Sequence, residues 1–232
     1  MPLKRWIKST NYAIEGILHS AKTERHLRCH LYAAVAVLLI SYITGISRQD
    51  FLIIAIVTVM VLLAELLNTS IEAVTDLLSP EKTEKARIAK DVAAGAVLIT
   101  ALGAAIIGYI ILTPYLKRWF QEGFYIARHS EEEVSIIALV FVLILVVITK
   151  AYMGRGSPLR GGMPSGHAAL AFSIWVIVTF ITGNFISSLL CFCLASAVAA
   201  SRVIQKIHST WEVILGGLMG ALVTYLLFKA FI

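Results

Sequence analysis

The chain has 232 residues, of which 59% are hydrophobic and 15% are charged, and its formal net charge is +6. Together with a mean hydropathy of +0.84, this composition excludes an ordinary soluble globular domain and indicates an integral membrane protein. Membrane flanks account for the excess of Lys and Arg, so we expect no nucleic-acid partner.

The segment before the first apolar run is basic. In Met1 to Lys22, apolar residues such as Ile14 and Leu18 are interspersed with Lys and Ser, which predicts an amphipathic helix at the membrane interface. The alternative is an ordinary basic flank that orients the first span. No cleavable signal peptide is expected, because this stretch is longer and more mixed in composition than a short charged leader.

Seven apolar runs follow, with lengths that favour membrane-spanning helices. Because neither strand alternation nor an internal repeat is visible, we expect an all-α integral membrane fold with about seven transmembrane helices. Residues 1–112, including the amphipathic helix, form a three-span module; residues 113–133 form an interfacial connector; and residues 134–232 form a four-span module. The runs are His30–Ile46, Phe51–Leu67, Val92–Leu112, Val134–Ile148, Ala168–Thr182, Phe185–Ala200 and Val213–Phe231.

The distribution of basic residues predicts the sidedness of the chain. Lys and Arg cluster before the first run and again at 82–90, and the positive-inside rule places both clusters in the cytoplasm. If each run crosses the membrane once, the connector is external. Residues 150–167 and 201–212 then both return to the cytoplasmic side.

The second apolar run carries a polar stripe of four residues, Glu65, Asn68, Glu72 and Asp76. Their spacings of three, four and four residues place them on one face of a helix. Carboxylates in a membrane-length segment are costly to desolvate, and they persist where they face a partner, a metal or a cavity. A structural seam of interhelical hydrogen bonds is the alternative interpretation.

Phosphoryl transfer from ATP is a reaction that this stripe can support. The reaction needs Mg²⁺ held by oxygen ligands, a cation on the phosphates and a base for the acceptor hydroxyl. No Walker-type glycine loop is present, so a kinase built on this stripe is of another class. The candidates are Glu24, Glu72 and Asp76 for the oxygens, Lys90 for the cation and Glu65 for the base.

Three stretches in the first module, ELLNTSIEAVTD, AKDVAAGAVL and Thr23-Glu24-Arg25, resemble motifs of the bacterial membrane diacylglycerol kinase and undecaprenol kinase family. The resemblance covers residues 4–112. It implies three-span protomers, a homotrimer with active sites between protomers, and the use of MgATP on a lipid alcohol in the bacterial cytoplasmic membrane. The context of His30 looks closer to the undecaprenol kinases. By this resemblance, Glu65 is the catalytic base, and Glu24 and Glu72 are metal ligands. The nucleotide site comprises these two residues together with Asn68, Asp76, Lys90 and Asp91.

The second module carries two histidines, His167 and His208, near the starts of apolar runs. Backbone donors of Ser165 and Gly166 at a helix start can bind a phosphate, where the helix dipole favours an anion. One histidine can then attack phosphorus while the other protonates the leaving oxygen. Glu212 lies one helical turn after His208, where it can orient the imidazole.

Pro164-Ser165-Gly166-His167, and Ser201-Arg202 followed by His208, make residues 134–232 resemble the type 2 phosphatidic acid phosphatase superfamily. The resemblance implies a histidine nucleophile and no metal. Ser157 stands where the family has arginine, although Arg155 and Arg160 flank it; the terminal acid is glutamate rather than aspartate; and four spans replace the usual six. The implied roles are nucleophile for His208, general acid for His167, and phosphate binding for Lys150, Ser165, Gly166 and Arg202, with Arg155 or Arg160 replacing the missing arginine.

The two modules together predict a bifunctional lipid kinase and phosphatase with both sites facing the cytoplasm. A futile cycle is avoided if the kinase phosphorylates undecaprenol while the phosphatase acts on undecaprenyl diphosphate, since both reactions yield the same monophosphate. A diacylglycerol kinase joined to a phosphatidate or phosphatidylglycerophosphate phosphatase is the first alternative. A lipid-binding membrane protein with one inactive module is the second.

Overall fold

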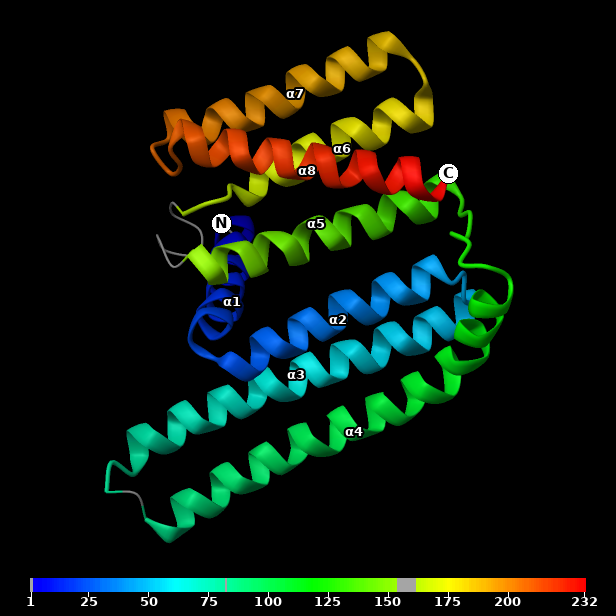
Figure 1. Ribbon diagram of the computed structural model, residues 1–232. Helices are drawn as coiled ribbons and strands as arrows, with labels where there is room; N and C mark the ends of the chain where they lie inside the picture. The colour runs from blue at the N-terminus through cyan, green and yellow to red at the C-terminus, as the bar shows by residue number, and fades with distance from the viewer. Residues whose placement is uncertain (1, 82, 154–161) are drawn as a thin grey trace. The chain divides into compact units, whose positions relative to one another are not determined.

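The computed structural model describes residues 2–81, 83–153 and 162–232, and these residues form eight helices and no strand. Six helices are long and apolar enough to cross a membrane, and α6 is apolar but shorter. The prediction of an all-α membrane fold with about seven spanning helices is therefore confirmed. The helices are α1 (Pro2–Thr23), α2 (Arg25–Ile43), α3 (Arg48–Leu78), α4 (Glu84–Gln121), α5 (Glu131–Met153), α6 (Gly166–Thr182), α7 (Phe185–Ile204) and α8 (Thr210–Phe231) (Figure 1).

Side-chain caps determine where several helices begin. Ser47 accepts a hydrogen bond from the backbone of α3, Thr83 from that of α4, and Asn184 from that of α7. Such caps satisfy backbone N–H groups that have no partner within the helix. Gly183 ends α6 in the left-handed region, with φ at 56°, so the tight connection to α7 suits a residue without a Cβ atom.

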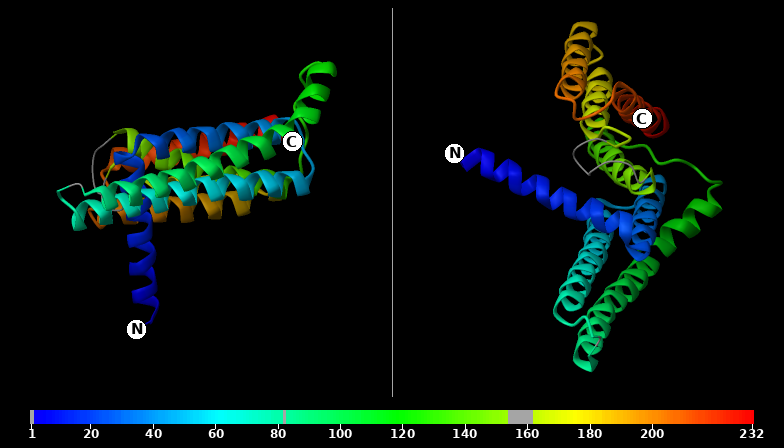
Figure 2. Two further views of the ribbon diagram at one scale, coloured as in Figure 1. Left: turned by 90° about the horizontal axis from the view of Figure 1, so that it is seen from below. Right: turned by 90° about the vertical axis from the view of Figure 1, so that its left-hand side faces the viewer.

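Residues 24–127 form one compact unit that contains α2, α3 and α4. Helix α3 packs against both α2 and α4 (Figure 1). At one end of the unit, the Tyr115 hydroxyl donates to the Asp50 carboxylate across 2.6 Å and joins α4 to the start of α3. Helix α4 continues past Pro114 into the segment predicted as a connector, and its C-terminal part turns away from the rest of the helix (Figure 2).

Residues 1–23 and 128–232 form the second compact unit. Helix α6 packs against α5, α7 and α8, while α1 packs against α5. By contact, the N-terminal helix therefore groups with the C-terminal helices rather than with α2, α3 and α4. Where the functional modules begin and end stays a prediction.

Glycines bring α8 unusually close to α6. A Cβ atom on Gly216 would lie 2.3 Å from the carbonyl oxygen of Ser165, and one on Gly220 would lie 1.9 Å from that of Ala169. This is the small-xxx-small pattern that lets membrane helices approach closely. Deeper in the same interface, the hydroxyls of Ser173 and Thr224 are 2.6 Å apart and fully buried.

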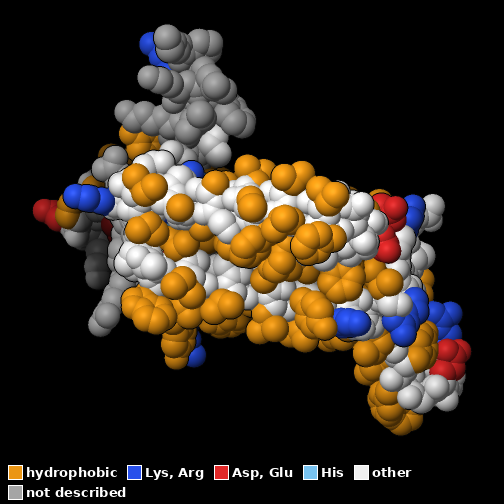
Figure 3. All heavy atoms as spheres, turned by 90° about the horizontal axis from the view of Figure 1, so that it is seen from above, with side chains coloured by type: hydrophobic (Ala, Val, Ile, Leu, Met, Phe, Trp, Pro, Cys, Tyr) orange, Lys and Arg blue, Asp and Glu red, His pale blue; other side chains and the backbone are white. Residues whose placement is uncertain are grey.

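Charged and apolar side chains are segregated along the helices. On the face shown in Figure 3, hydrophobic side chains cover the middle of the helices, whereas Lys, Arg, Asp and Glu lie toward the ends. This is the distribution expected where the helix sides meet hydrocarbon and the ends meet water. Glu65, which lies well inside α3, is an exception.

Candidate functional sites

The polar stripe lies on α3 and runs from a buried to an exposed position. Glu65 is 4% exposed, Asn68 and Glu72 are half-buried, and Asp76 is exposed near the end of the helix. Asn68 Nδ2 donates to Glu72 Oε1 across 2.9 Å. Among the described residues, Asn68 Oδ1 is buried without a hydrogen-bond partner. A buried carbonyl oxygen normally accepts a hydrogen bond or binds a cation. The Oδ1 atom of Asn68 is therefore a candidate atom for binding a ligand.

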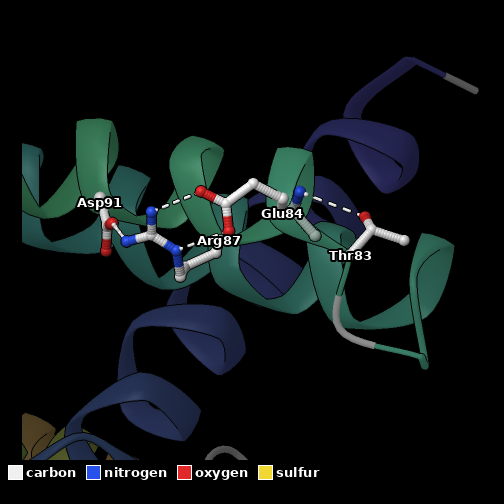
Figure 4. A network of polar contacts seen from close by, with 5 residues as sticks. Thr83, Glu84, Arg87 and Asp91 are labelled. Atoms are coloured by element: carbon white, nitrogen blue, oxygen red, sulfur yellow. Dashed lines mark hydrogen bonds and ion pairs between the residues drawn. The ribbon is translucent and has the colours of Figure 1, made fainter.

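A basic residue on α4 faces the outer end of the stripe. Lys90 Nζ lies 2.6 Å from Asp76 Oδ1 and links α4 to α3. On the same first turns of α4, Arg87 bridges Glu84 and Asp91 at 2.6 and 2.7 Å (Figure 4). All of these side chains are at least one third exposed, so the ion pairs contribute little to stability and can open toward a ligand.

Two residues predicted to bind metal, Glu24 and Glu72, are not gathered into one complete site. Glu24 precedes α2 as its N-cap residue, half-buried, and its side chain does not bond the helix backbone. In the part of the chain that the structure describes, no group of three or more His, Cys, Asp or Glu side chains is placed to hold a metal ion. Glu72 and the free Oδ1 of Asn68 are hard oxygen donors of the kind that suits Mg²⁺. The roles of Glu24 and Glu72 as metal ligands therefore stay predictions.

An apolar cavity of about 220 Å³ opens within the same unit, between α2, α3 and α4. Small residues, among them Ala101, Ala104 and Gly108, form much of its wall, and His30 is its most polar lining residue. Val61 also lines the cavity and lies one turn before Glu65 on α3. The cavity thus shares a helix face with the buried carboxylate.

The second site centres on His208, whose side chain is 2% exposed. Its Nδ1 atom lies 2.8 Å from Glu212 Oε2. Glu212 also closes a capping box with Ser209 at the start of α8, and its Oε1 atom accepts from the backbone N–H of Gly162 across 3.2 Å. With Nδ1 engaged, the Nε2 atom is the one left to react.

Two further polar groups lie buried at the same end of the unit without partners. Among the described residues, Ser165 Oγ and Arg202 Nε make no hydrogen bond. The Ser165 N–H donates to the Glu212 carbonyl across 2.9 Å, and the Arg202 carbonyl accepts from the His208 N–H across 3.2 Å, so the backbone holds both residues beside the histidine. Ser165 is also the N-cap of α6, a position suited to anions. Both residues thus place unpartnered polar atoms near His208.

Three of the remaining predicted residues of this site are described by the structure, and two are not. Lys150 is 7% exposed at the end of α5 and interacts electrostatically with Glu212. His167 is exposed in the first turn of α6 and lies within electrostatic reach of Arg202, His208 and Lys150. Gly166 follows Ser165, and a Cβ atom there would lie 3.2 Å from Val146 Cγ1. Arg155 and Arg160 lie outside the described residues.

Our sequence interpretation missed Gly162, Gly216 and Gly220. The carbonyl of Ser165 leaves no room for a side chain at Gly216, so this glycine determines how closely the Ser165 segment approaches α8. The spacing of four between Gly216 and Gly220 in an apolar helix was the available signal. Gly162 contributes only its backbone N–H, which residue type does not reveal.

Comparison with known proteins gives a first match that covers the Glu65 stripe. The family model for prokaryotic diacylglycerol kinase matches residues 11–112. The undecaprenol kinase of Bacillus subtilis (strain 168) is 40% identical over 114 residues, which are 49% of this chain and 93% of that protein. The diacylglycerol kinase of Synechocystis sp. is 38% identical over 109 residues, 47% of this chain and 62% of that protein. That of Pseudomonas aeruginosa is 30% identical over 94 residues, 40% of this chain and 76% of that protein.

The second match covers the other site. The PAP2 superfamily model matches residues 96–231, which include every described residue of the His208 site. Both family models include residues 96–112, within α4. No solved structure gives a significant match.

Proposed function

The chain belongs to the prokaryotic diacylglycerol kinase family through residues 11–112 and to the PAP2 superfamily through residues 96–231, and from this we propose that it is a bifunctional lipid kinase and lipid phosphatase. Each family match coincides with its own constellation of buried polar residues, the Glu65 stripe and the His208 site. That coincidence is the observation that carries the proposal.

Undecaprenol is the acceptor that we favour for the kinase. The B. subtilis relative named undecaprenol kinase is 40% identical to this chain and is matched over 93% of its length. The phosphatase then acts on undecaprenyl diphosphate, so that both reactions produce undecaprenyl monophosphate. Diacylglycerol with phosphatidate or phosphatidylglycerophosphate is the second candidate, because two other relatives are named diacylglycerol kinase.

In the kinase reaction, Glu65 accepts the proton of the lipid hydroxyl. Glu65 lies within α3, a helix long and apolar enough to cross a membrane, which supports a lipid alcohol reaching the carboxylate without leaving the bilayer. The cavity that begins at Val61 on the same helix face accommodates the first part of the lipid chain. The lipid therefore approaches the stripe from its buried end.

The nucleotide approaches the stripe from its exposed end. Lys90 leaves Asp76 to contact phosphate oxygens, while Asp91 contributes to the nucleotide site. Glu72 and Asn68 present oxygens to Mg²⁺, which when bound neutralises charge on the phosphates. Glu24 joins them as a metal ligand. Since one chain offers an incomplete set, we propose that a homotrimer completes each site with residues from two protomers.

In the phosphatase reaction, His208 Nε2 attacks phosphorus while Glu212 holds Nδ1 and stabilises the positive ring. The bond from phosphorus to the leaving oxygen breaks, and His167 protonates that oxygen. His167 then takes a proton from the water that hydrolyses the phosphohistidine, which releases inorganic phosphate. Arg202, Lys150, Ser165 and the N–H of Gly166 bind the phosphate oxygens. Arg155 or Arg160 supplies the guanidinium that Ser157 lacks.

Both reactions take place on the cytoplasmic side of a bacterial inner membrane. Within the second unit, the phosphatase residues that the structure describes lie at the ends of helices that share one end of the bundle: the last turn of α5, the starts of α6 and α8, and the last turn of α7. Lys150, Arg202 and Lys206 concentrate positive charge there, as the positive-inside rule requires.

A substrate survey tests the lipid assignment. Purified full-length protein is given undecaprenol or diacylglycerol with MgATP, and separately undecaprenyl diphosphate, phosphatidate or phosphatidylglycerophosphate, and products are quantified by mass spectrometry. We expect turnover of undecaprenol and undecaprenyl diphosphate. Turnover of diacylglycerol and phosphatidate, with no reaction of the polyprenyl lipids, establishes the glycerolipid alternative instead.

A further inference from the structure

A second cavity, of about 180 Å³, opens beside the phosphatase site and within the same unit. Its described walls come from the end of α5, from residues 163 and 164, and from α8. They carry hydrocarbon and thioether groups and a single hydroxyl. The lining residues are Thr149, Met153, Met163, Pro164, Leu215 and Met219, and we call this cavity the methionine groove.

The methionine groove is built on the same segments as the phosphate site. Thr149 is the neighbour of Lys150 on α5, and Pro164 is the neighbour of Ser165. On α8, Leu215 lies three residues after Glu212 and Met219 lies four residues after Leu215, so all three share a helix face. Each wall of the groove therefore comes from a segment that also carries a residue of the phosphate site.

The described residues do not fully enclose the groove. Met153 is 46% exposed and Leu215 is 40% exposed, although both lie on apolar helices of membrane-spanning length. Three of the six lining residues are methionines. Their unbranched, polarizable side chains adapt to apolar ligands of irregular shape. Thus a polar, anion-binding end and an apolar, adaptable end meet at one place.

That arrangement matches the shape of one kind of molecule, an amphiphile with a phosphate head and a hydrocarbon tail. We propose that the methionine groove binds the head-proximal part of the hydrocarbon chain of the phosphatase substrate, which enters laterally from the bilayer between α5 and α8. The inference rests on the proposed phosphatase function. It adds where the lipid chain lies and which residues select it.

Filling the groove tests the proposal. Met219→Trp and Leu215→Trp place an indole in the cavity, and Leu218→Trp is the matched control, because Leu218 is 62% exposed on the same helix and does not line the groove. Each purified full-length variant is assayed with undecaprenyl diphosphate and with phenyl phosphate, which has no lipid chain. We expect the two groove variants to lower kcat/KM for the lipid about tenfold or more, mainly through KM, and to leave phenyl phosphate hydrolysis within about twofold of wild type.

Two outcomes overturn the proposal, and a third concerns the phosphatase itself. If Leu218→Trp impairs lipid turnover as much as Met219→Trp, or if the groove variants lose both substrates equally, the lipid chain does not lie in this groove. If the wild-type protein hydrolyses neither substrate, the proposed phosphatase function fails instead.

A labelling experiment on the wild-type protein keeps the test independent of variant folding. A lipid phosphate with a diazirine close to its head group is photolysed with the purified protein, and labelled peptides are identified by mass spectrometry. We expect labels on Met153 or Met219, suppressed by excess unlabelled lipid. Labels confined to other helix faces contradict the proposal.

Discussion

His208 Nδ1 and Glu212 Oε2 lie 2.8 Å apart across one turn at the start of α8. The same carboxylate reaches Gly162 through its other oxygen, so a single side chain holds both the histidine and the segment that leads to Ser165. The longer side chain of glutamate permits this double contact from a position within the first helical turn.

Replacing Glu212 separates these two roles. Glu212→Ala removes the partner of His208 Nδ1 and the acceptor for Gly162, and we expect phosphatase kcat to fall by about 10²–10⁴. Glu212→Asp is shorter by one methylene and keeps only one of the two contacts, so an intermediate loss is expected. Lipid kinase activity, measured on the same preparations, stays unchanged. Full phosphatase activity in Glu212→Asp contradicts the two-contact role.

Close approach of α8 to α6 makes its glycines sensitive to substitution. Gly216→Ala and Gly220→Ala drive a methyl group into the carbonyls of Ser165 and Ala169, so the helices must separate. We expect a loss of about 1–3 kcal/mol in stability, visible as a lower Tm, with reduced phosphatase activity. Gly103→Ala is the matched control because a Cβ atom there meets nothing within 4 Å. An unchanged Tm in Gly220→Ala contradicts this packing.

Glu65 is the residue whose removal should affect the kinase alone. Glu65→Gln keeps the shape of a side chain that is 4% exposed but cannot accept the hydroxyl proton, so we expect kinase kcat to fall by about 10²–10⁴. Tm should not decrease, because an amide is cheaper to bury than a carboxylate. A lower Tm with kinase activity retained identifies the stripe as a structural seam instead.

Lys90 and Asp76 form an ion pair that we assign to nucleotide binding rather than to stability. Since the two side chains are 34% and 62% exposed, Lys90→Met should change the free energy of unfolding by less than about 1 kcal/mol. It should nevertheless raise KM for ATP about tenfold or more. Arg87→Met removes two neighbouring exposed ion pairs and serves as the comparison. If both variants raise KM equally, general surface charge explains the effect.

Helical periodicity predicted much of the fold and the local geometry within each candidate site. The spacing of Glu65, Asn68 and Glu72 correctly placed them on one face of one helix, and the interval from His208 to Glu212 anticipated their contact. These predictions succeeded because each depends on residues close in sequence, where the helix alone fixes the geometry.

Features that depend on tertiary packing could not be predicted in the same way. The interfacial connector was predicted to begin at residue 113, yet α4 continues to Gln121. The contact of α1 with α5 joins distant segments whose pairing no local pattern indicates. The assignment of Glu24 and Glu72 to one metal is still a prediction. In the homotrimer that we propose, a second protomer completes the site, and the helical periodicity of one chain does not indicate which residues of two chains meet.

We propose that one chain forms the same lipid monophosphate by two independent reactions. The most direct measurement follows undecaprenyl monophosphate formed by purified wild-type, Glu65→Gln and His208→Ala proteins, from undecaprenol with MgATP and, separately, from undecaprenyl diphosphate. We predict that the wild type forms it from both substrates, that Glu65→Gln loses only the first reaction, and that His208→Ala loses only the second. Formation from neither substrate by the wild type, or loss of both reactions in either variant while that variant remains folded, contradicts the claim.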